Sequence, residues 1–393
     1  MTTTAPPIDR AALAELRREP SPWSAKGLPL GRKTASIAEL TAGHPRLDQA
    51  GFTFPLMTLL ESELANDIDV LADFCAVRGV DLAPHGKTTM APQLFARQLD
   101  AGAWGISAAT IDHLLVYRRF GVQRVLLANE LVEVPALRWV LDELAYDPGF
   151  EFLFYLDSIA GVEAARAALE ATGVTRGLRA LVEIGIPGGR TGCRSVAEAL
   201  VVAEAATTVT GLEIAGIAGY EGLFGYHGAP GAADRVRDYL SGLREALTAF
   251  VAAGILPSTR AAVISAAGSQ FFDLVVDGLH DAWPADERPH VIIRPGSYVA
   301  HADIPETDDS PLRRAGFAGH LRPAAVIWAR VLSRPEPGQA FASAGRRDLS
   351  WDVSLPTVRW IWRTGAERPL RAAGVEVTLL NDQHAFLALD ALV

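Results

Sequence analysis

The amino-acid sequence predicts an α/β protein built from a TIM-type (β/α)8 barrel and a smaller C-terminal β domain. Three observations predict this arrangement. Short apolar runs alternate with helix-like segments over residues 55–304, eight of these runs have the length of barrel strands, and the chain after residue 304 has more strand-like runs and fewer helices. An open doubly wound sheet is the alternative for the same alternation.

Residues 1–54 are rich in proline, glycine and charge, and they predict an irregular arm with one short helix that partly joins the β domain. A strand is expected at 55–60, and a helix at 61–78 because Leu64, Ile68 and Leu71 recur at helical spacing. The eight barrel strands are expected at 80–84, 104–107, 124–128, 151–156, 179–185, 212–219, 262–266 and 290–294.

Helical segments separate most of these strands. They are expected at 91–101, 111–120, 135–145, 159–172, 196–206 and 232–253, so the barrel domain is predicted to span 55–304. The predicted C-terminal β domain, 305–393, has strand-like runs at 324–332, 375–380 and 385–389 and a turn-forming segment at 334–338.

Composition excludes several classes of protein. Of the 393 residues, 49% are hydrophobic and 21% charged, which indicates a folded chain. The net charge of −10 and the lack of a basic run argue against a nucleic-acid partner. Two cysteines without paired spacing argue against a disulfide framework, and no apolar stretch has the length of a membrane span or signal peptide. We therefore expect a cytoplasmic protein with no membrane partner.

Lysine is rare in this chain. Of 36 basic residues only Lys26, Lys33 and Lys87 are lysines, so arginine takes most solvated basic positions and a remaining lysine is a candidate for chemistry that arginine cannot perform. Arginine stays protonated, whereas a partly desolvated lysine can lose its proton and attack a carbonyl. Lys87 is the candidate, because it directly follows the first predicted barrel strand; a solvated loop lysine is the alternative interpretation.

Glycines and hydroxyl side chains follow the last two predicted barrel strands. Gly268 and Ser269 follow the seventh strand, and Gly296 and Ser297 follow the eighth. Barrel enzymes often bind phosphate there, so we expect backbone N–H groups of these loops to hold a phosphate while Lys87 holds an aldehyde as a Schiff base. Taken singly, each glycine is also explained as an ordinary turn residue.

A series of motifs, in a fixed order over roughly residues 55–387, resembles one family. The motifs are Pro-His-Gly-Lys-Thr at 84–88, the segments 101–110 and 127–130, Glu-Ile-Gly at 183–185 with Arg-Thr-Gly at 190–192, Gly-Tyr-Glu-Gly at 219–222, Arg-Pro-Gly-Ser-Tyr at 294–298, and 345–352. The series resembles the D-threonine aldolase and D-serine dehydratase (D-amino acid deaminase) family. These enzymes have the alanine-racemase fold and use pyridoxal 5′-phosphate (PLP).

The resemblance implies roles for individual residues. Lys87 corresponds to the Schiff-base lysine, and Arg190 to the arginine that contacts the phenolic oxygen of the cofactor. Ring and phosphate contacts are implied for Tyr220, Gly268, Ser269, Gly296 and Ser297. A small-molecule D-amino acid as substrate and a homodimer are implied as well.

Three histidines are candidates for acid–base chemistry. His85 shares a strand face with Lys87 if the backbone there is extended, while a hydrogen-bonded structural histidine is equally consistent with the pattern. His384 lies in a motif that resembles the family's, and His227 follows the sixth predicted strand. A surface or interface histidine is the alternative for both.

The chain departs from the family in one respect. Members that cleave or dehydrate place a divalent metal, often zinc, beside the cofactor to act on the β-hydroxyl. Their His-x-Cys or His-x-Asp ligand pair corresponds to a position beyond Val393, so the metal ligands are unknown and we expect the β domain to lack its last strands.

The sequence therefore predicts a PLP-dependent lyase that acts on D-β-hydroxy amino acids. A D-serine-type dehydratase or deaminase that gives a keto acid and ammonia is the first hypothesis, since the lysine motif is closer to the deaminases. D-Threonine-aldolase-type cleavage to glycine and an aldehyde is the alternative, and an amino acid racemase or a non-catalytic PLP-binding protein remains open.

Overall fold

The computed structural model describes residues 8–22, 24–30, 35–49, 51–173, 176–225, 229–283, 288–301, 310–352 and 354–390. These residues form two compact units. Unit 1 is built mainly from Ala65–Val299, and unit 2 mainly from Ala14–Leu64 and Arg322–Val393. The domain limits at 54 and 304 remain predictions.

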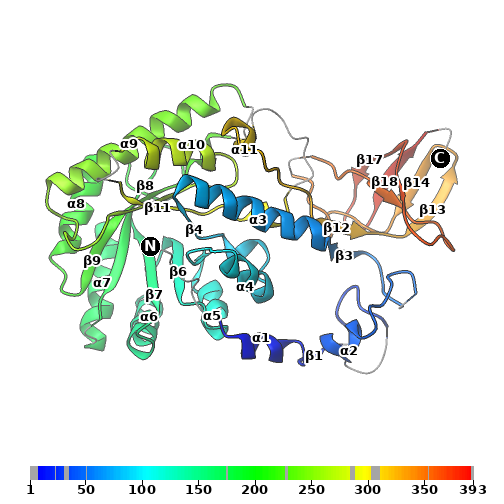
Figure 1. Ribbon diagram of the computed structural model, residues 1–393, viewed down its shortest axis with the longest axis horizontal. Helices are drawn as coiled ribbons and strands as arrows, with labels where there is room; N and C mark the ends of the chain where they lie inside the picture. The colour runs from blue at the N-terminus through cyan, green and yellow to red at the C-terminus, as the bar shows by residue number, and fades with distance from the viewer. Residues whose placement is uncertain are drawn as a thin grey trace. The chain divides into compact units, whose positions relative to one another are not determined.

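The core of unit 1 is a sheet of eight parallel strands (Figure 1). The strands are β4 (Asp81–Leu82), β5 (Ile106–Ala108), β6 (Arg124–Glu130), β7 (Glu151–Leu156), β8 (Leu178–Ile184), β9 (Leu212–Gly219), β10 (Val263–Ala266) and β11 (His290–Ile293). They pair in the order β4-β11-β10-β9-β8-β7-β6-β5. A bridge between His85 and Ser107 and a 2.7 Å bond from Trp104 N–H to the Leu82 carbonyl join the two ends. The predicted barrel is confirmed, and the open doubly wound alternative is wrong.

Helices alternate with these strands along the chain. They are α1 (Arg10–Leu16), α3 (Glu61–Arg78), α4 (Pro92–Asp100), α5 (Ile111–Arg119), α6 (Val134–Tyr146), α7 (Ile159–Thr172), α8 (Val196–Thr207), α9 (Ala232–Ala252), α10 (Phe272–Val276) and α11 (Pro311–Arg314). Hydroxyl side chains of Thr110, Ser158 and Ser195 cap α5, α7 and α8 by accepting a backbone N–H. No helix within the described ranges is both long and apolar enough to cross a membrane.

Apolar side chains fill the interior of the barrel. One buried cluster takes its members from almost every strand: Ala83, Trp104, Leu126, Leu153, Tyr155, Leu181, Ala215, Ala218, Val263 and Ile292. The helices cover the outer face, so the strands are buried on both sides and read in the sequence as continuous apolar runs. Polar chemistry is therefore concentrated where the strands end.

Unit 2 is a smaller β domain, as the sequence predicts. Its four-stranded antiparallel sheet has the order β13 (Val331–Glu336), β14 (Gln339–Ala342), β18 (Ala385–Leu389), β17 (Val375–Leu380). Two-stranded pairs join β3 (Leu56–Leu59) to β12 (Ala325–Trp328), β15 (Trp360–Ile361) to β16 (Leu370–Arg371), and β1 (Pro20–Ser21) to β2 (Ala35–Ser36), after which the short helix α2 (Ile37–Thr41) follows.

Candidate active site

Lys87 lies in a short 3-10 turn, η1 (Gly86–Thr88), directly after β4. A side chain at Gly86 would place its Cβ 2.3 Å from the Tyr117 hydroxyl, so only glycine permits this turn to pack on α5. The pKa of Lys87 is lowered, first by partial burial and then by the positive charges of Arg190 and Arg294. The lower pKa increases the fraction of neutral amine, which is the nucleophilic form.

His85 precedes this turn and joins β5 through its bridge with Ser107. Its Nδ1 atom is buried and has no hydrogen-bond partner among the described residues. Burial lowers the pKa of His85 to about 3, and the charges of Lys87, Arg294 and His113 act in the same direction. The imidazole is therefore neutral at physiological pH and a weak base. Its predicted catalytic role stays a prediction.

Arg190 and Tyr220 come together from the loops after β8 and β9. The Arg190 guanidinium carbon lies 4.7 Å from the centroid of the Tyr220 ring. The backbone of Tyr220 is held by Tyr239, whose hydroxyl accepts the Tyr220 N–H at 3.0 Å and donates to the Ile184 carbonyl at 2.5 Å. The positive charge of Arg190 also lowers the pKa of Lys87. The predicted site residues Arg190 and Lys87 are therefore close enough to interact electrostatically.

The two predicted phosphate loops meet through their serines. The Ser297 hydroxyl donates to the Ser269 hydroxyl over 2.8 Å. At Gly296, a Cβ would lie 2.6 Å from Thr88 Oγ1 and 2.8 Å from His85 Cβ, so the loop after β11 packs tightly against the lysine turn. The structure thus brings Ser269, Gly296 and Ser297 together, with Gly296 beside the turn that carries Lys87.

One detail of the predicted phosphate contact needs correction. The N–H of Gly268 donates to Glu221 Oε1 at 2.8 Å, so it is not available to a phosphate in this structure. Gly268 contributes instead by lacking a side chain, since a Cβ there would lie 3.0 Å from Cε2 of Tyr220. The tyrosine ring occupies that space.

Two buried charged residues of the site have no role in the sequence-based prediction. Arg294 is only 5% exposed and donates to the Gly219 carbonyl at 2.8 Å and to the Ser265 hydroxyl. Glu221 is fully buried and accepts from Ala267 and Gly268. Arg294 belongs to the Arg-Pro-Gly-Ser-Tyr motif and Glu221 to the Gly-Tyr-Glu-Gly motif, and a charged residue at the end of an apolar strand is the signal that identifies each.

A pair of acidic side chains lies at the ends of β6 and β8. Glu183 is 4% exposed, and burial together with the neighbouring Glu183 carboxyl raises the pKa of Glu130 to about 8. No described residue donates a hydrogen bond to either oxygen of Glu130 or to Glu183 Oε2. Burial and a neighbouring carboxyl group both disfavour the charged form of Glu130, so this side chain keeps its proton to a higher pH than an ordinary glutamate.

Two histidines remain from the sequence-based candidates. His384 is exposed in the turn between β17 and β18 of unit 2, where its carbonyl accepts the Asn381 N–H at 2.9 Å; its catalytic role stays a prediction. His227 lies outside the described residues. In the part of the chain that the structure describes, no group of three or more His, Cys, Asp or Glu side chains is placed to hold a metal ion.

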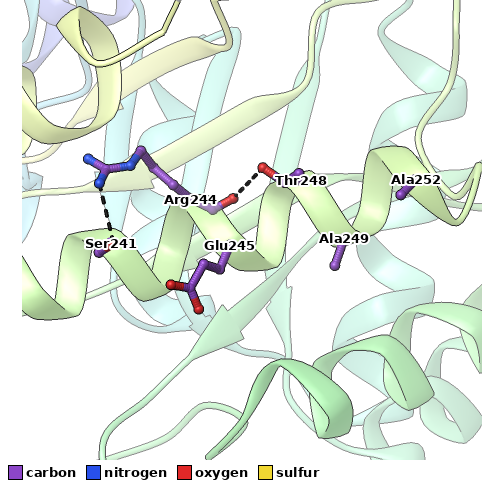
Figure 2. Close-up of a pocket in the computed structure, with 6 residues that line it drawn as sticks. All are labelled: Ser241, Arg244, Glu245, Thr248, Ala249 and Ala252. Atoms are coloured by element: carbon purple, nitrogen blue, oxygen red, sulfur yellow. Dashed lines mark hydrogen bonds between the residues drawn. The ribbon is translucent and has the colours of Figure 1, made fainter.

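A separate hollow lies along helix α9, lined by Ser241, Arg244, Glu245, Thr248, Ala249 and Ala252 (Figure 2). Arg244 donates to Ser241 and to the Gly278 carbonyl, and Thr248 donates to the Arg244 carbonyl. These polar groups are occupied within the protein, and the hollow contains none of the strand-end residues. We do not include it in the site.

Comparison with known proteins gives matches to lyases. The model of a putative serine dehydratase domain matches residues 324–392. The D-threonine aldolase of Arthrobacter sp is 25% identical over 314 residues, which cover 79% of this chain and 73% of that protein. The resemblance predicted from the sequence is confirmed.

Solved structures give the fold. D-Threonine aldolase from Filomicrobium marinum has a TM-score of 0.67 and 24% identity, covering 86% of this chain and 83% of its own. D-threo-3-hydroxyaspartate dehydratase from Delftia sp. HT23 has a TM-score of 0.64 and 19% identity, covering 86% and 84%. Alanine racemase from Bacillus anthracis has a TM-score of 0.56 and 14% identity, covering 85% and 82%. The chain therefore has the alanine-racemase-like fold.

Proposed function

We propose that this protein is a PLP-dependent lyase that acts on a D-β-hydroxy amino acid. The observation that carries the proposal is the position of Lys87, a lysine with a lowered pKa that sits in a turn packed against the Gly296–Ser297 loop. The similarity to D-threonine aldolase and the match to a serine dehydratase domain support the choice of substrate class. A homodimer is part of the same proposal.

The residues present fit PLP. An amine with a lowered pKa suits the aldehyde, and the hydroxyls of Ser269 and Ser297 suit the phosphate. A Cβ at Gly268 or Gly296 would collide with Tyr220 or with the lysine turn, so both glycines let these segments pack closely at the strand ends. The cofactor, when bound, supplies an electron sink that weakens the bonds of the substrate α-carbon.

Lys87, Arg190 and His85 would then have different roles in the reaction. The neutral Lys87 amine accepts the proton from the substrate α-carbon, because its lowered pKa makes it available as a base. Arg190 binds an anionic oxygen beside the Tyr220 ring, which it already contacts. His85, neutral and a weak base, donates or accepts a hydrogen bond without carrying charge.

Two reactions fit this arrangement. Dehydration breaks the Cα–H and Cβ–O bonds and turns D-serine into pyruvate and ammonia after the loss and return of water. Aldol cleavage breaks the Cα–Cβ bond and turns D-threonine into glycine and acetaldehyde. We retain dehydration as the first choice, supported by the domain match at 324–392, and keep cleavage as the second because the relative that aligns along most of the chain is an aldolase.

Product analysis tests the proposal. The purified chain with PLP is supplied with D-serine, D-threonine and their L-enantiomers, with and without Zn²⁺, and pyruvate, 2-oxobutyrate, ammonia, glycine and acetaldehyde are measured. Keto acid and ammonia from the D-enantiomers alone are expected; glycine and aldehyde would favour the second reaction.

Lys87→Ala should lower the rate about 1000-fold or more. Lys87→Arg should do the same, because arginine keeps the positive charge but has no nucleophilic amine. Full activity in either variant contradicts the assignment of Lys87.

A further inference from the structure

Glu221 is a fully buried carboxylate that the proposed mechanism does not use. It begins the short turn η2 (Glu221–Phe224) after β9. Its Oε2 atom accepts the N–H of Ala267 at 2.9 Å, and its Oε1 atom accepts the N–H of Gly268 at 2.8 Å. One side chain therefore fixes two successive peptide groups of the loop that follows the next strand, β10.

The loop that Glu221 holds has an unfavourable backbone conformation. Ala267 has φ = 77°, in the left-handed region that non-glycine residues rarely adopt. Its N–H is bound by Glu221, and its carbonyl accepts the N–H of Arg294 at 3.1 Å. Because such a conformation persists only when its surroundings enforce it, these bonds determine the path of the loop.

The geometry of these bonds is that of an ionised carboxylate. Burial raises the pKa of Glu221, while the two N–H groups and the Arg294 guanidinium oppose this by stabilising the charge. An ionised carboxylate only accepts hydrogen bonds, so it suits two N–H donors at once. A glutamine at this position offers one acceptor, and its NH2 group would face the second N–H.

The same loop carries Ser269, two residues beyond Ala267. Its hydroxyl accepts a hydrogen bond from the Ser297 hydroxyl at 2.8 Å. Gly268, which lies between Ala267 and Ser269 in the chain, packs against the Tyr220 ring. A change in the peptide planes at 267 and 268 therefore moves Ser269 relative to Ser297. It leaves the turn that carries Lys87 in place, because that turn packs on Tyr117 and Gly296.

We propose that Glu221 is a positioning residue for the phosphate group of the cofactor: it holds the 267–269 backbone so that the Ser269 and Ser297 hydroxyls converge on that phosphate. The inference rests on the proposed function, since it names what one residue does for the proposed cofactor. It separates the phosphate end of the site, which depends on Glu221, from the aldehyde end, which depends on Lys87.

The test compares PLP with pyridoxal, which has the same aldehyde and no phosphate. Dissociation constants of both are measured by absorbance on the full-length wild-type chain and on Glu221→Gln. Loss of a bond to a charged group predicts a rise of about 10- to 100-fold for PLP, whereas the constant for pyridoxal should stay within about twofold. Ser269→Ala should show the same selective loss. Glu170→Gln, the same substitution at an exposed position of α7, is the matched control and should leave the ratio of the two constants unchanged.

A second measurement needs no cofactor. Amide hydrogen exchange at residues 267 and 268 should be faster by about tenfold or more in Glu221→Gln. Adding Ala267→Gly removes the conformational penalty and should restore part of the PLP affinity, which a general loss of stability would not allow. Should Glu221→Gln fail to fold, Glu221→Asp keeps the charge, cannot reach both N–H groups and should show the selective loss to a smaller degree.

The outcomes are distinct. Equal weakening of PLP and pyridoxal, or unchanged exchange at 267 and 268, overturns the role of Glu221. If neither compound reacts with Lys87 of the wild-type chain, the proposed function fails, and the exchange measurement still decides whether Glu221 holds the loop.

Discussion

At the scale of single residues, two titratable groups have pKa values displaced toward neutrality from opposite sides. Partial burial and two neighbouring cations lower the pKa of Lys87, while burial and a neighbouring carboxyl raise the pKa of Glu130 to about 8. Pairs of groups that their surroundings shift in this way are typical of acid–base sites. The strand ends of the barrel therefore carry a lysine that loses its proton more easily than usual, Lys87, and a glutamate that keeps its proton to higher pH than usual, Glu130.

The retained proton predicts a dependence of stability on pH. The ordinary pKa of the Glu130 carboxyl is 4.5 and its folded value is about 8, so the folded protein binds more protons than the unfolded chain between these values. Stability should then fall as pH rises through that window. Glu130→Gln removes the carboxyl that must ionise, so its advantage over wild type should grow to roughly 1–2 kcal/mol at pH 9, a value discounted for partial exposure.

Urea denaturation between pH 5 and 9 measures this difference. Glu170→Gln, on the exposed part of α7, is the control and should give a difference from wild type that does not change with pH. Parallel stability profiles for wild type and Glu130→Gln would show that Glu130 ionises normally in the folded protein.

The sequence identifies a site residue when the pattern that marks it lies in neighbouring residues of the chain. Lys87 stands out as one of three lysines after an apolar strand, and the serines at 269 and 297 lie in glycine-containing loops. Glu221 bonds residues 46 and 47 positions away in the chain, and no local pattern encodes such a contact. The same holds for His113, whose charge lowers the pKa of His85 although the two residues are 28 positions apart in the chain.

At the scale of elements, the barrel strands were predictable because each is an apolar run buried on both faces. The segment that forms α10 shows the limit of this approach. Its sequence, Phe-Asp-Leu-Val-Val, has the composition of a strand, yet it forms a helix because its place between β10 and β11 requires a crossover. In unit 2, the four-residue β14 was also missed, since so short a run gives little periodicity.

Gly86 tests the packing of the lysine turn. Gly86→Ala places a methyl group 2.3 Å from the Tyr117 hydroxyl, so the turn or α5 must shift. Overpacking of this kind should cost about 1–3 kcal/mol and weaken both PLP and pyridoxal, because it displaces Lys87 itself. Thermal denaturation and the two dissociation constants measure the effect.

A second glycine supplies the control. Gly242 lies within α9, and its added Cβ would meet nothing within 4 Å, so Gly242→Ala should stabilise the protein by about 0.5–1 kcal/mol through helix propensity. If Gly86→Ala behaves like Gly242→Ala, the close contact with Tyr117 does not constrain the turn.

At the scale of the whole molecule, the parallel order of the strands explains why a linear sequence predicts the site. All eight strands of unit 1 run in one direction, so the residues that follow them meet at one end of the barrel. Lys87, Arg190, Tyr220, Ser269 and Ser297 follow five of these strands. His384 belongs to unit 2 and follows no barrel strand, so the same rule gives its location no support.

The central claim is that Lys87 binds the aldehyde of PLP and that the bound form accepts D-amino acids. The most direct measurement is the visible absorption spectrum of the full-length protein with PLP, before and after addition of D-serine, compared with L-serine and with Lys87→Ala. A visible band that requires Lys87 and changes with D-serine alone is the predicted result. An identical spectrum in Lys87→Ala, or an equal response to both enantiomers, would contradict the account.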